Sequence, residues 1–170
     1  MSTPSPLGRY APASAGRAPL VQVRLLGVPV RVLAAAREHH DNVLREFRLL
    51  ALSGSAAGTA APARLVELTQ VLGVQYAGAR ARPDAAVDAA LDRGDDTVDL
   101  VYEVPAEAAD AARVLDALMA EADELCRAEA LLTVHRSQAI TDFASWYLRE
   151  FVEQCSGGAA TPWSGPVDPD

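Results

Sequence analysis

The sequence predicts an α+β fold that is predominantly helical, with about five helices and a small sheet of two or three short strands. Through most of the chain, apolar residues recur every three or four positions, which is the period of an α-helix with one buried face. Two short segments alternate apolar and polar residues instead, as half-buried strands do. Half of the 170 residues are apolar, which is enough for one core without a disulfide or a metal ion.

The first element expected is a short strand, in which Val21, Val23 and Leu25 alternate with polar residues. Such alternation gives a strand one buried face. Gly27 and Pro29 follow, and both residue types are common in turns. We therefore expect the strand to end there.

Three helices are expected between the two strands. Apolar residues spaced by three and four along residues 30–51 predict one long helix, and a similar stripe along residues 65–76 predicts a second. The Gly-, Ala- and Ser-rich segment 53–62 between them is expected to be a mobile loop. A third, short helix should begin at Pro83, because proline is favoured in the first turn, and end at Gly94.

The second half of the chain predicts a strand and two further helices. Alternation along residues 97–104 predicts the second strand, and Pro105 marks the place where the next helix should begin. An unbroken apolar stripe along residues 108–125 makes that helix the clearest in the chain. Residues 131–134 are interpreted as a third strand or a break, and the last helix is expected along residues 137–155.

These elements are predicted to form one globular domain over residues 20–156. Residues 1–19 are expected to be a disordered lead, and residues 157–170 a flexible tail rich in Pro, Gly and Asp. Cys126 and Cys155 are the only cysteines, and two lone cysteines favour a reducing compartment. The chain shows no signal peptide and no run of about 18 apolar residues, so we expect a cytoplasmic protein that does not enter a membrane.

The net charge of −8 argues against binding to nucleic acid, which needs a basic surface. The charge is unevenly distributed: residues 1–82 hold ten arginines and four acids, and residues 83–170 hold five arginines and nineteen acids. Two explanations stay open. The two halves could neutralise each other when they fold, or an acidic face could steer a basic partner.

The segment Glu38–Asp41 has the residue types of a metal site, but its spacing does not fit one. Neighbouring residues on a helix point about 100° apart, so His39 and His40 cannot chelate one ion together. His40 falls on the apolar stripe, where it is either a buried histidine or a contact for a small ligand. The acidic segment 92–96 lacks the pattern of a calcium loop. We therefore expect no metal site and no cofactor.

No catalytic motif is present, because the sequence lacks the phosphate-binding, dinucleotide-binding, nucleophile-elbow and zinc-protease patterns. His135, Ser137 and Asp142 could be assembled into a Ser/His/Asp arrangement, but a chain of this length permits such a choice by chance. An enzyme of an unrecognised class stays open.

The final helix carries the aromatic residues of most interest. Tyr147 follows its inward stripe, whereas Trp146 points to the flank of the helix. One interpretation makes Trp146 an exposed anchor for a partner protein, with Glu150 and Glu153 along the same flank. The alternative is that Trp146 covers a neighbouring loop and that Trp163 folds back onto the helix.

Several segments together carry a resemblance to a known family. They are Val23–Val30, Arg37–His39 with Leu44–Phe47, Tyr102–Glu107, Cys126–Ala128, and Trp146–Phe151 with Thr161–Trp163. The chain resembles a family of small uncharacterised proteins from GC-rich bacteria. Members of that family resemble companions of partner-switching regulators: anti-sigma-factor serine kinases, their STAS-domain antagonists and the matching phosphatases. The resemblance implies a protein partner, such as an anti-sigma factor or a STAS-type regulator.

The resemblance does not imply that this chain binds ATP. The anti-sigma kinases resemble histidine-kinase ATPases, which need an asparagine-bearing helix and a DxGxG turn around the nucleotide. Asn42 has an acidic neighbour, but the sequence contains no DxGxG, and Gly94-Asp95-Asp96 is not a substitute for it.

The leading hypothesis is a non-enzymatic regulatory protein that binds another protein, as an accessory in bacterial partner-switching signal transduction. The alternative is a sensor that binds a small ligand between its helices, with His40 and nearby arginines as polar contacts. A polar pocket around His40 would favour the sensor, whereas an exposed patch around Trp146 would favour the partner-binding protein.

Overall fold

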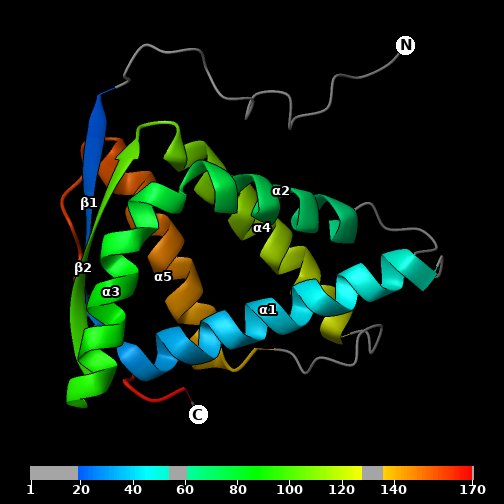
Figure 1. Cartoon of the computed structure of the whole chain (residues 1–170), viewed down its shortest axis with the longest axis horizontal. Coiled ribbons are helices and arrows are strands. Elements are labelled where there is room, and N and C mark those ends of the chain that lie inside the picture. The colour runs from blue at the N-terminus through cyan, green and yellow to red at the C-terminus, as the bar shows by residue number, and fades with distance from the viewer. Residues whose placement is uncertain (1–18, 54–60, 128–135, 170) are drawn as a thin grey trace.

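A computed structural model describes residues 19–53, 61–127 and 136–169, and the side chains of residues 19–49, 63–124 and 136–169. The elements follow in the order β1 (Leu20–Pro29), α1 (Val30–Ser53), α2 (Ala61–Gln75), α3 (Ala77–Arg93), β2 (Thr97–Pro105), α4 (Ala108–Arg127) and α5 (Gln138–Cys155). The described residues thus form five helices and two strands, which confirms the predicted α+β, mostly helical fold (Figure 1). The expected lead, the loop 53–62 and the possible strand 131–134 lie almost wholly outside the described residues.

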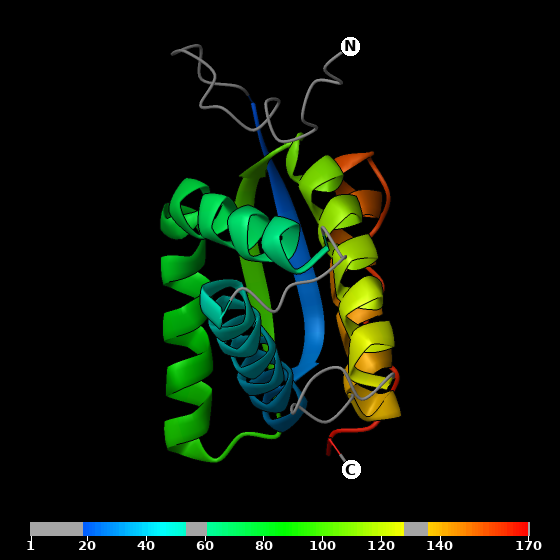
Figure 2. The same cartoon turned by 90° about the vertical axis from the view of Figure 1, so that its right-hand side faces the viewer.

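The sheet consists of β1 and β2, which pair antiparallel with Val23 opposite Tyr102 and Leu25 opposite Leu100. These four side chains are buried, because alternate residues of a strand point to the same face. Residues on the opposite face, such as Glu103, are exposed. Figure 2 shows α1 and α2 in front of the two strands, so the sheet has one covered and one solvated face.

β1 is longer than predicted, because Gly27 forms a β-bulge instead of ending the strand. The pairing register shifts between Leu25 and Val28, so that Leu26 and Gly27 together lie opposite Asp99. Gly27 has a φ of 66°, a left-handed conformation that glycine adopts without steric cost. Its N–H donates to Asp99 Oδ1 at 2.7 Å. The glycine therefore lets the strand continue directly to the start of α1.

α3 begins earlier than predicted. Pro83, expected at its start, lies well inside it, since the helix begins at Ala77. A proline here removes the N–H that would bond to the Ala79 carbonyl, but its ring is buried in the domain, and this packing offsets the cost. The end of the helix is as predicted, because Gly94 adopts a φ of 71° and its N–H donates to the Leu91 carbonyl at 3.0 Å.

The buried side chains form two clusters. The larger cluster lies between the sheet and helices α1, α3 and α5, and it includes Leu25, Tyr102 and Phe143. The smaller cluster lies between α1, α2 and α4, and it includes Phe47 and Leu118. α1 contributes to both, so this long helix joins the sheet end of the domain to the α2–α4 end.

The C-terminal tail, which the sequence predicts to be flexible, packs on the domain over residues 157–169. The Trp163 indole packs against Phe143 and Trp146, with ring centroids 5.6 and 5.4 Å away. Ser137 Oγ donates to the Pro169 carbonyl at 2.6 Å, and Arg31 forms an ion pair with Asp168 at 2.7 Å. Aromatic packing and polar contacts therefore hold the tail along its length, although its composition is typical of a disordered segment.

The tail and α5 also cover the free edge of β1. The Gln154 amide accepts a hydrogen bond from the Arg24 N–H at 2.8 Å and donates one to the Arg24 carbonyl at 2.9 Å. Two residues further along the strand, the Leu26 carbonyl accepts from the Trp163 N–H at 2.9 Å. These bonds satisfy backbone groups that a third strand would otherwise pair.

Candidate ligand-binding pocket

A pocket of about 300 Å³ lies between the five helices and β2, at the junction of the two buried clusters. Its walls are mainly apolar and include Leu33 of α1, Leu72 of α2, Leu115 and Met119 of α4, and Phe143 of α5. This volume is at the lower end of the range for small-molecule sites, which is about 300–1,000 Å³. The pocket has room for a ligand rather than for a few water molecules alone.

Small side chains on the helices leave this space open. Ala108, Ala111 and Ala112 of α4 and Ala144 of α5 all line the pocket. A larger apolar residue at any of these positions would extend toward the pocket and reduce its volume. Alanine at these helix positions therefore leaves an internal cavity.

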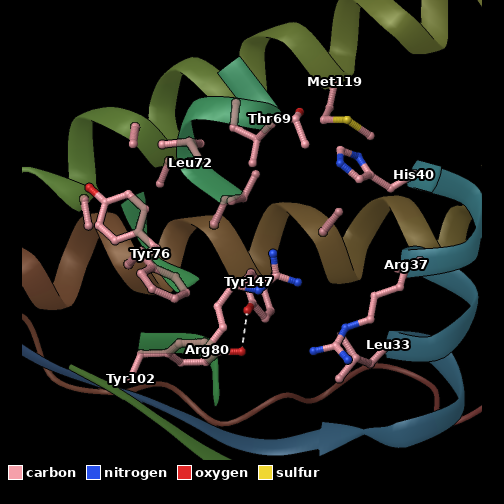
Figure 3. Close-up of a pocket in the computed structure, with 18 of the residues that line it drawn as sticks. Leu33, Arg37, His40, Thr69, Leu72, Tyr76, Arg80, Tyr102, Met119 and Tyr147 are labelled. Atoms are coloured by element: carbon pink, nitrogen blue, oxygen red, sulfur yellow. Dashed lines mark hydrogen bonds between the residues drawn. The ribbon is translucent and has the colours of Figure 1, made fainter. Parts of the chain in front are cut away.

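Polar side chains from four elements converge on the pocket. They are Arg37 and His40 of α1, Arg80 of α3, Tyr102 of β2 and Tyr147 of α5. Figure 3 shows Arg37, Arg80 and the two tyrosines directed toward the same space, with His40 beside Met119. The Tyr147 hydroxyl donates to the Tyr102 hydroxyl at 2.7 Å. The structure thus places His40, the ligand-binding candidate from sequence, in the wall of a pocket.

Arg37 and Arg80 share one carboxylate. Arg37 donates to Asp84 Oδ1 at 2.7 Å, and Arg80 Nε lies 3.9 Å from Asp84 Oδ2. The arginine side chains are 37% and 53% exposed, so they lie where the pocket meets solvent. Two guanidinium groups with one acidic partner leave a local excess of positive charge.

The histidine and the tyrosines of the pocket are neutral near pH 7. Burial lowers the pKa of His40 below its usual 6.5, with the positive charges of Arg80 and Arg136 acting in the same direction and Asp41 opposing them. Burial raises the pKa of Tyr102 and raises that of Tyr147 further, while Arg37 and Arg80 oppose both shifts. The tyrosines therefore act as hydroxyl donors and acceptors, and the net charge of the pocket comes from its arginines.

A buried ion pair forms another part of the wall. Arg136 lines the pocket, and its Nε donates to both carboxylate oxygens of Asp123 at 2.9 Å. Each side chain is only 7% exposed. The pair joins α4 to the segment that leads into α5, two residues before its start, and the positive charge of Arg136 is matched by Asp123.

The structure does not support the partner-binding surface predicted around Trp146. Trp146 is 4% exposed and Glu150 is fully buried, whereas Glu153 is exposed. The tail covers this flank: the Trp146 indole N–H donates to the Thr161 carbonyl at 3.0 Å, and the Thr161 N–H donates to Glu150 Oε2 at 3.0 Å. Trp146 thus follows the alternative interpretation, in which it covers a neighbouring segment and Trp163 folds back onto α5.

Glu150 was missed as a buried residue because its surroundings come from distant parts of the chain. Its Oε2 also accepts from Gln154 Nε2 at 2.8 Å, while Oε1 is buried and has no hydrogen-bond partner among the described residues. A carboxyl group in this position connects α5 to the tail at Thr161. Glu150 lies outside the pocket lining, so we assign it a structural position and no ligand contact.

The remaining candidates do not form a site. The Ser137 hydroxyl accepts from the Ile140 N–H at 3.3 Å as the N-cap of α5, Asp142 pairs with the Gln138 amide, and His135 lies outside the described residues. Cys155 is half-buried, and burial raises the pKa of its thiol, which disfavours the reactive thiolate. The Cys126 side chain also lies outside the described part.

Within the described ranges, no three His, Cys, Asp or Glu side chains gather as metal ligands, and no helix is long and apolar enough to cross a membrane. The pocket brings several polar side chains of the described chain together inside apolar walls. Comparisons with protein-family models, with curated proteins and with solved structures find no match for this chain.

Proposed function

We propose that this protein binds a small, mainly apolar ligand in the pocket between its helices. The observation that supports the proposal is the pocket itself, with a volume of about 300 Å³, apolar walls and a few convergent polar groups. Apolar concavities of this kind, with a small number of oriented polar side chains, are the usual sites of small-molecule binding. The protein would therefore act as a ligand-binding sensor.

The pocket favours binding without catalysis. The Thr69 hydroxyl in its wall donates to the Leu65 carbonyl at 2.8 Å, so its proton is engaged in the backbone of α2. His40 lines the same pocket but is paired with no described nucleophile. These residues offer contacts for a ligand rather than the nucleophile and base of a covalent mechanism.

A ligand sensor is compatible with a regulatory role in partner switching. The anti-sigma factor or STAS-type partner, the cytoplasmic location and the signalling role are expectations from the sequence alone. Because Trp146 is buried, a partner would need a surface other than the flank first considered. Ligand binding could regulate such a contact by stabilising the helices around the pocket.

A pocket-filling substitution tests the proposal. Ala112→Leu adds volume to the pocket wall, and Ala117→Leu makes the same change at an exposed position of the same helix. The full-length chain is screened by thermal shift against a panel of small molecules, with native mass spectrometry of each hit. A saturating ligand should raise the melting temperature of the wild type by about 5–10 °C.

The two variants give opposite expected results. Ala112→Leu should abolish the thermal shift of a true pocket ligand, whereas Ala117→Leu should keep it. A panel ligand that stabilises both variants equally binds outside the pocket. If every hit behaves in that way, or if no compound stabilises the wild type, the proposed function is wrong.

A further inference from the structure

We infer that the pocket selects an amphipathic ligand with a single carboxylate, held by Arg37 and Arg80 at its opening with the apolar part of the ligand inside. This inference rests on the proposed function and specifies its ligand. Three observations support it: the position of the two arginines, the hydroxyl pair of Tyr102 and Tyr147, and the charge balance of the pocket wall.

The arginines are positioned for a carboxylate. Arg37 and Arg80 come from α1 and α3 and are held near each other by Asp84. Each guanidinium has five N–H donors in a planar fork that matches a carboxylate. Among the described residues, Arg80 forms no ion pair closer than its 3.9 Å contact with Asp84. Most of the donors of the two arginines are thus available to a ligand at the opening.

The tyrosine pair adds a hydroxyl donor beside them. The Tyr102 and Tyr147 hydroxyls lie 2.7 Å apart and share one hydrogen bond, which uses one of their two protons. Both tyrosines line the pocket, so the second hydroxyl proton lies at the pocket wall. A ligand oxygen near Arg37 and Arg80 could accept it, because Figure 3 shows the arginine and tyrosine side chains directed toward one space.

The charge balance of the pocket calls for one negative charge. Arg136 is neutralised by Asp123, and Asp84 neutralises one of the two arginines at the opening. His40 and the tyrosines carry no charge near pH 7, so a single positive charge is left over. Both arginines are partly exposed, so water solvates this charge when the ligand is neutral, whereas a cation would be repelled and an anion attracted. A monoanion restores neutrality, although the chain as a whole has a net charge of −8.

The apolar part of the ligand would extend toward Leu115 and Met119. An apolar cavity of about 150 Å³ binds benzene, with its six carbons, so a volume of about 300 Å³ suits a ligand with on the order of ten non-hydrogen atoms. Octanoate, with eight carbons and two oxygens, therefore matches the size, the charge and the apolar character of the pocket. 1-Octanol has nearly the same shape without the charge, and octylamine reverses the charge.

The test compares these three probes on the wild type and two variants. Arg80→Met removes the charge at the opening while it keeps a long side chain. Arg82→Met makes the same change at an exposed position of α3 that does not line the pocket. Calorimetric titration gives the dissociation constant of each probe, and melting without ligand confirms that each variant is folded.

Octanoate should bind the wild type at least about tenfold more tightly than 1-octanol, and octylamine should bind most weakly. Arg80→Met should weaken octanoate binding about tenfold to hundredfold, as expected for a lost charge-assisted hydrogen bond, and change 1-octanol binding less than about twofold. Arg82→Met should change neither. Equal affinities for octanoate and 1-octanol, or equal effects of the two variants on octanoate, would overturn the inference.

Failure of this inference can be distinguished from failure of the proposed function. If octanoate does not bind, but other small molecules bind the wild type and not Ala112→Leu, the carboxylate specificity is wrong and the pocket is still a ligand site. If octanoate binds Ala112→Leu as tightly as the wild type, it binds elsewhere, which overturns the carboxylate assignment and counts against the pocket as a site.

Discussion

Breaking the buried ion pair between Asp123 and Arg136 should destabilise the fold strongly. Each side chain is 7% exposed, and the guanidinium donates through Nε and Nη2 to both carboxylate oxygens. Asp123→Ala leaves the positive charge of Arg136 buried without a partner, so the free energy of unfolding should fall by about 3–5 kcal/mol. Adding Arg136→Met should recover part of that loss, because the double variant buries no unpaired charge.

A surface pair on the same helix is the matched control. Asp110 and Arg113 lie 2.7 Å apart, but their side chains are 73% and 52% exposed, so the equivalent substitutions should each change stability by less than about 1 kcal/mol. Urea unfolding followed by circular dichroism gives the free energy of unfolding of each single and double variant. The coupling energy should exceed about 1 kcal/mol for the buried pair and fall below that for the surface pair. Equal coupling energies would refute the reasoning.

Three further outcomes are expected. Leu118→Ala should lower the free energy of unfolding in urea by about 2–5 kcal/mol, because Leu118 is 3% exposed. Leu91→Ala, at a position 50% exposed, should lower it by less than about 1 kcal/mol, and similar losses in the two variants would place Leu118 outside the core. Because burial lowers the pKa of His40 below 6.5, its contribution to stability is present above about pH 6.5 and lost as the pH falls. The melting temperature of His40→Gln should therefore fall less than that of the wild type between about pH 6.5 and 5, and an equal fall in both proteins would contradict this. Gly27→Ala, at a φ of 66°, should destabilise by about 1–2 kcal/mol, whereas Gly78→Ala inside α3 should stabilise by up to about 1 kcal/mol; a gain at both positions would reject the left-handed requirement.

The helices and strands were predictable from sequence because their periodicity is local. The stripe along α4 and the alternation along β2 each depend on residues within one element, and the structure confirms both. Pro83 and Gly27 were misjudged for the opposite reason. Proline and glycine usually mark boundaries, but here one is buried inside a helix and the other forms a bulge. Tertiary packing decided both cases.

The pocket was only partly predictable. His40 was singled out because it falls on the apolar stripe of α1, where it was expected to be either a buried histidine or a ligand contact with nearby arginines beside it. Tyr102 and Arg80 were not singled out, since they lie on β2 and α3 and meet α1 only in the folded domain. One signal was available in the sequence: Tyr102 lies on the buried face of β2, and its hydroxyl group needs a hydrogen-bond partner inside the domain.

The packed tail could not be predicted from composition. Pro, Gly and Asp in residues 157–169 suggest disorder, and the opposing signal is a single aromatic residue, Trp163. Its indole packs on Phe143 and Trp146, and this apolar contact outweighs the low hydrophobicity of its neighbours. Trp146 and Glu150 are buried as a consequence, so the position of the tail also determines that these two residues of the predicted protein interface are covered.

The hydrogen bonds from Gln154 and Trp163 to β1 have a consequence for self-association. Arg24 and Gln154 are 130 residues apart in sequence. β1 therefore lies near the start of the chain, whereas Gln154 and Trp163, which cover its edge, lie near the end. During synthesis or partial unfolding, the Arg24 and Leu26 backbone groups would be open to pairing with the same strand of another molecule. Chains that lose their last residues would then aggregate in a concentration-dependent manner, even where the helical core is intact.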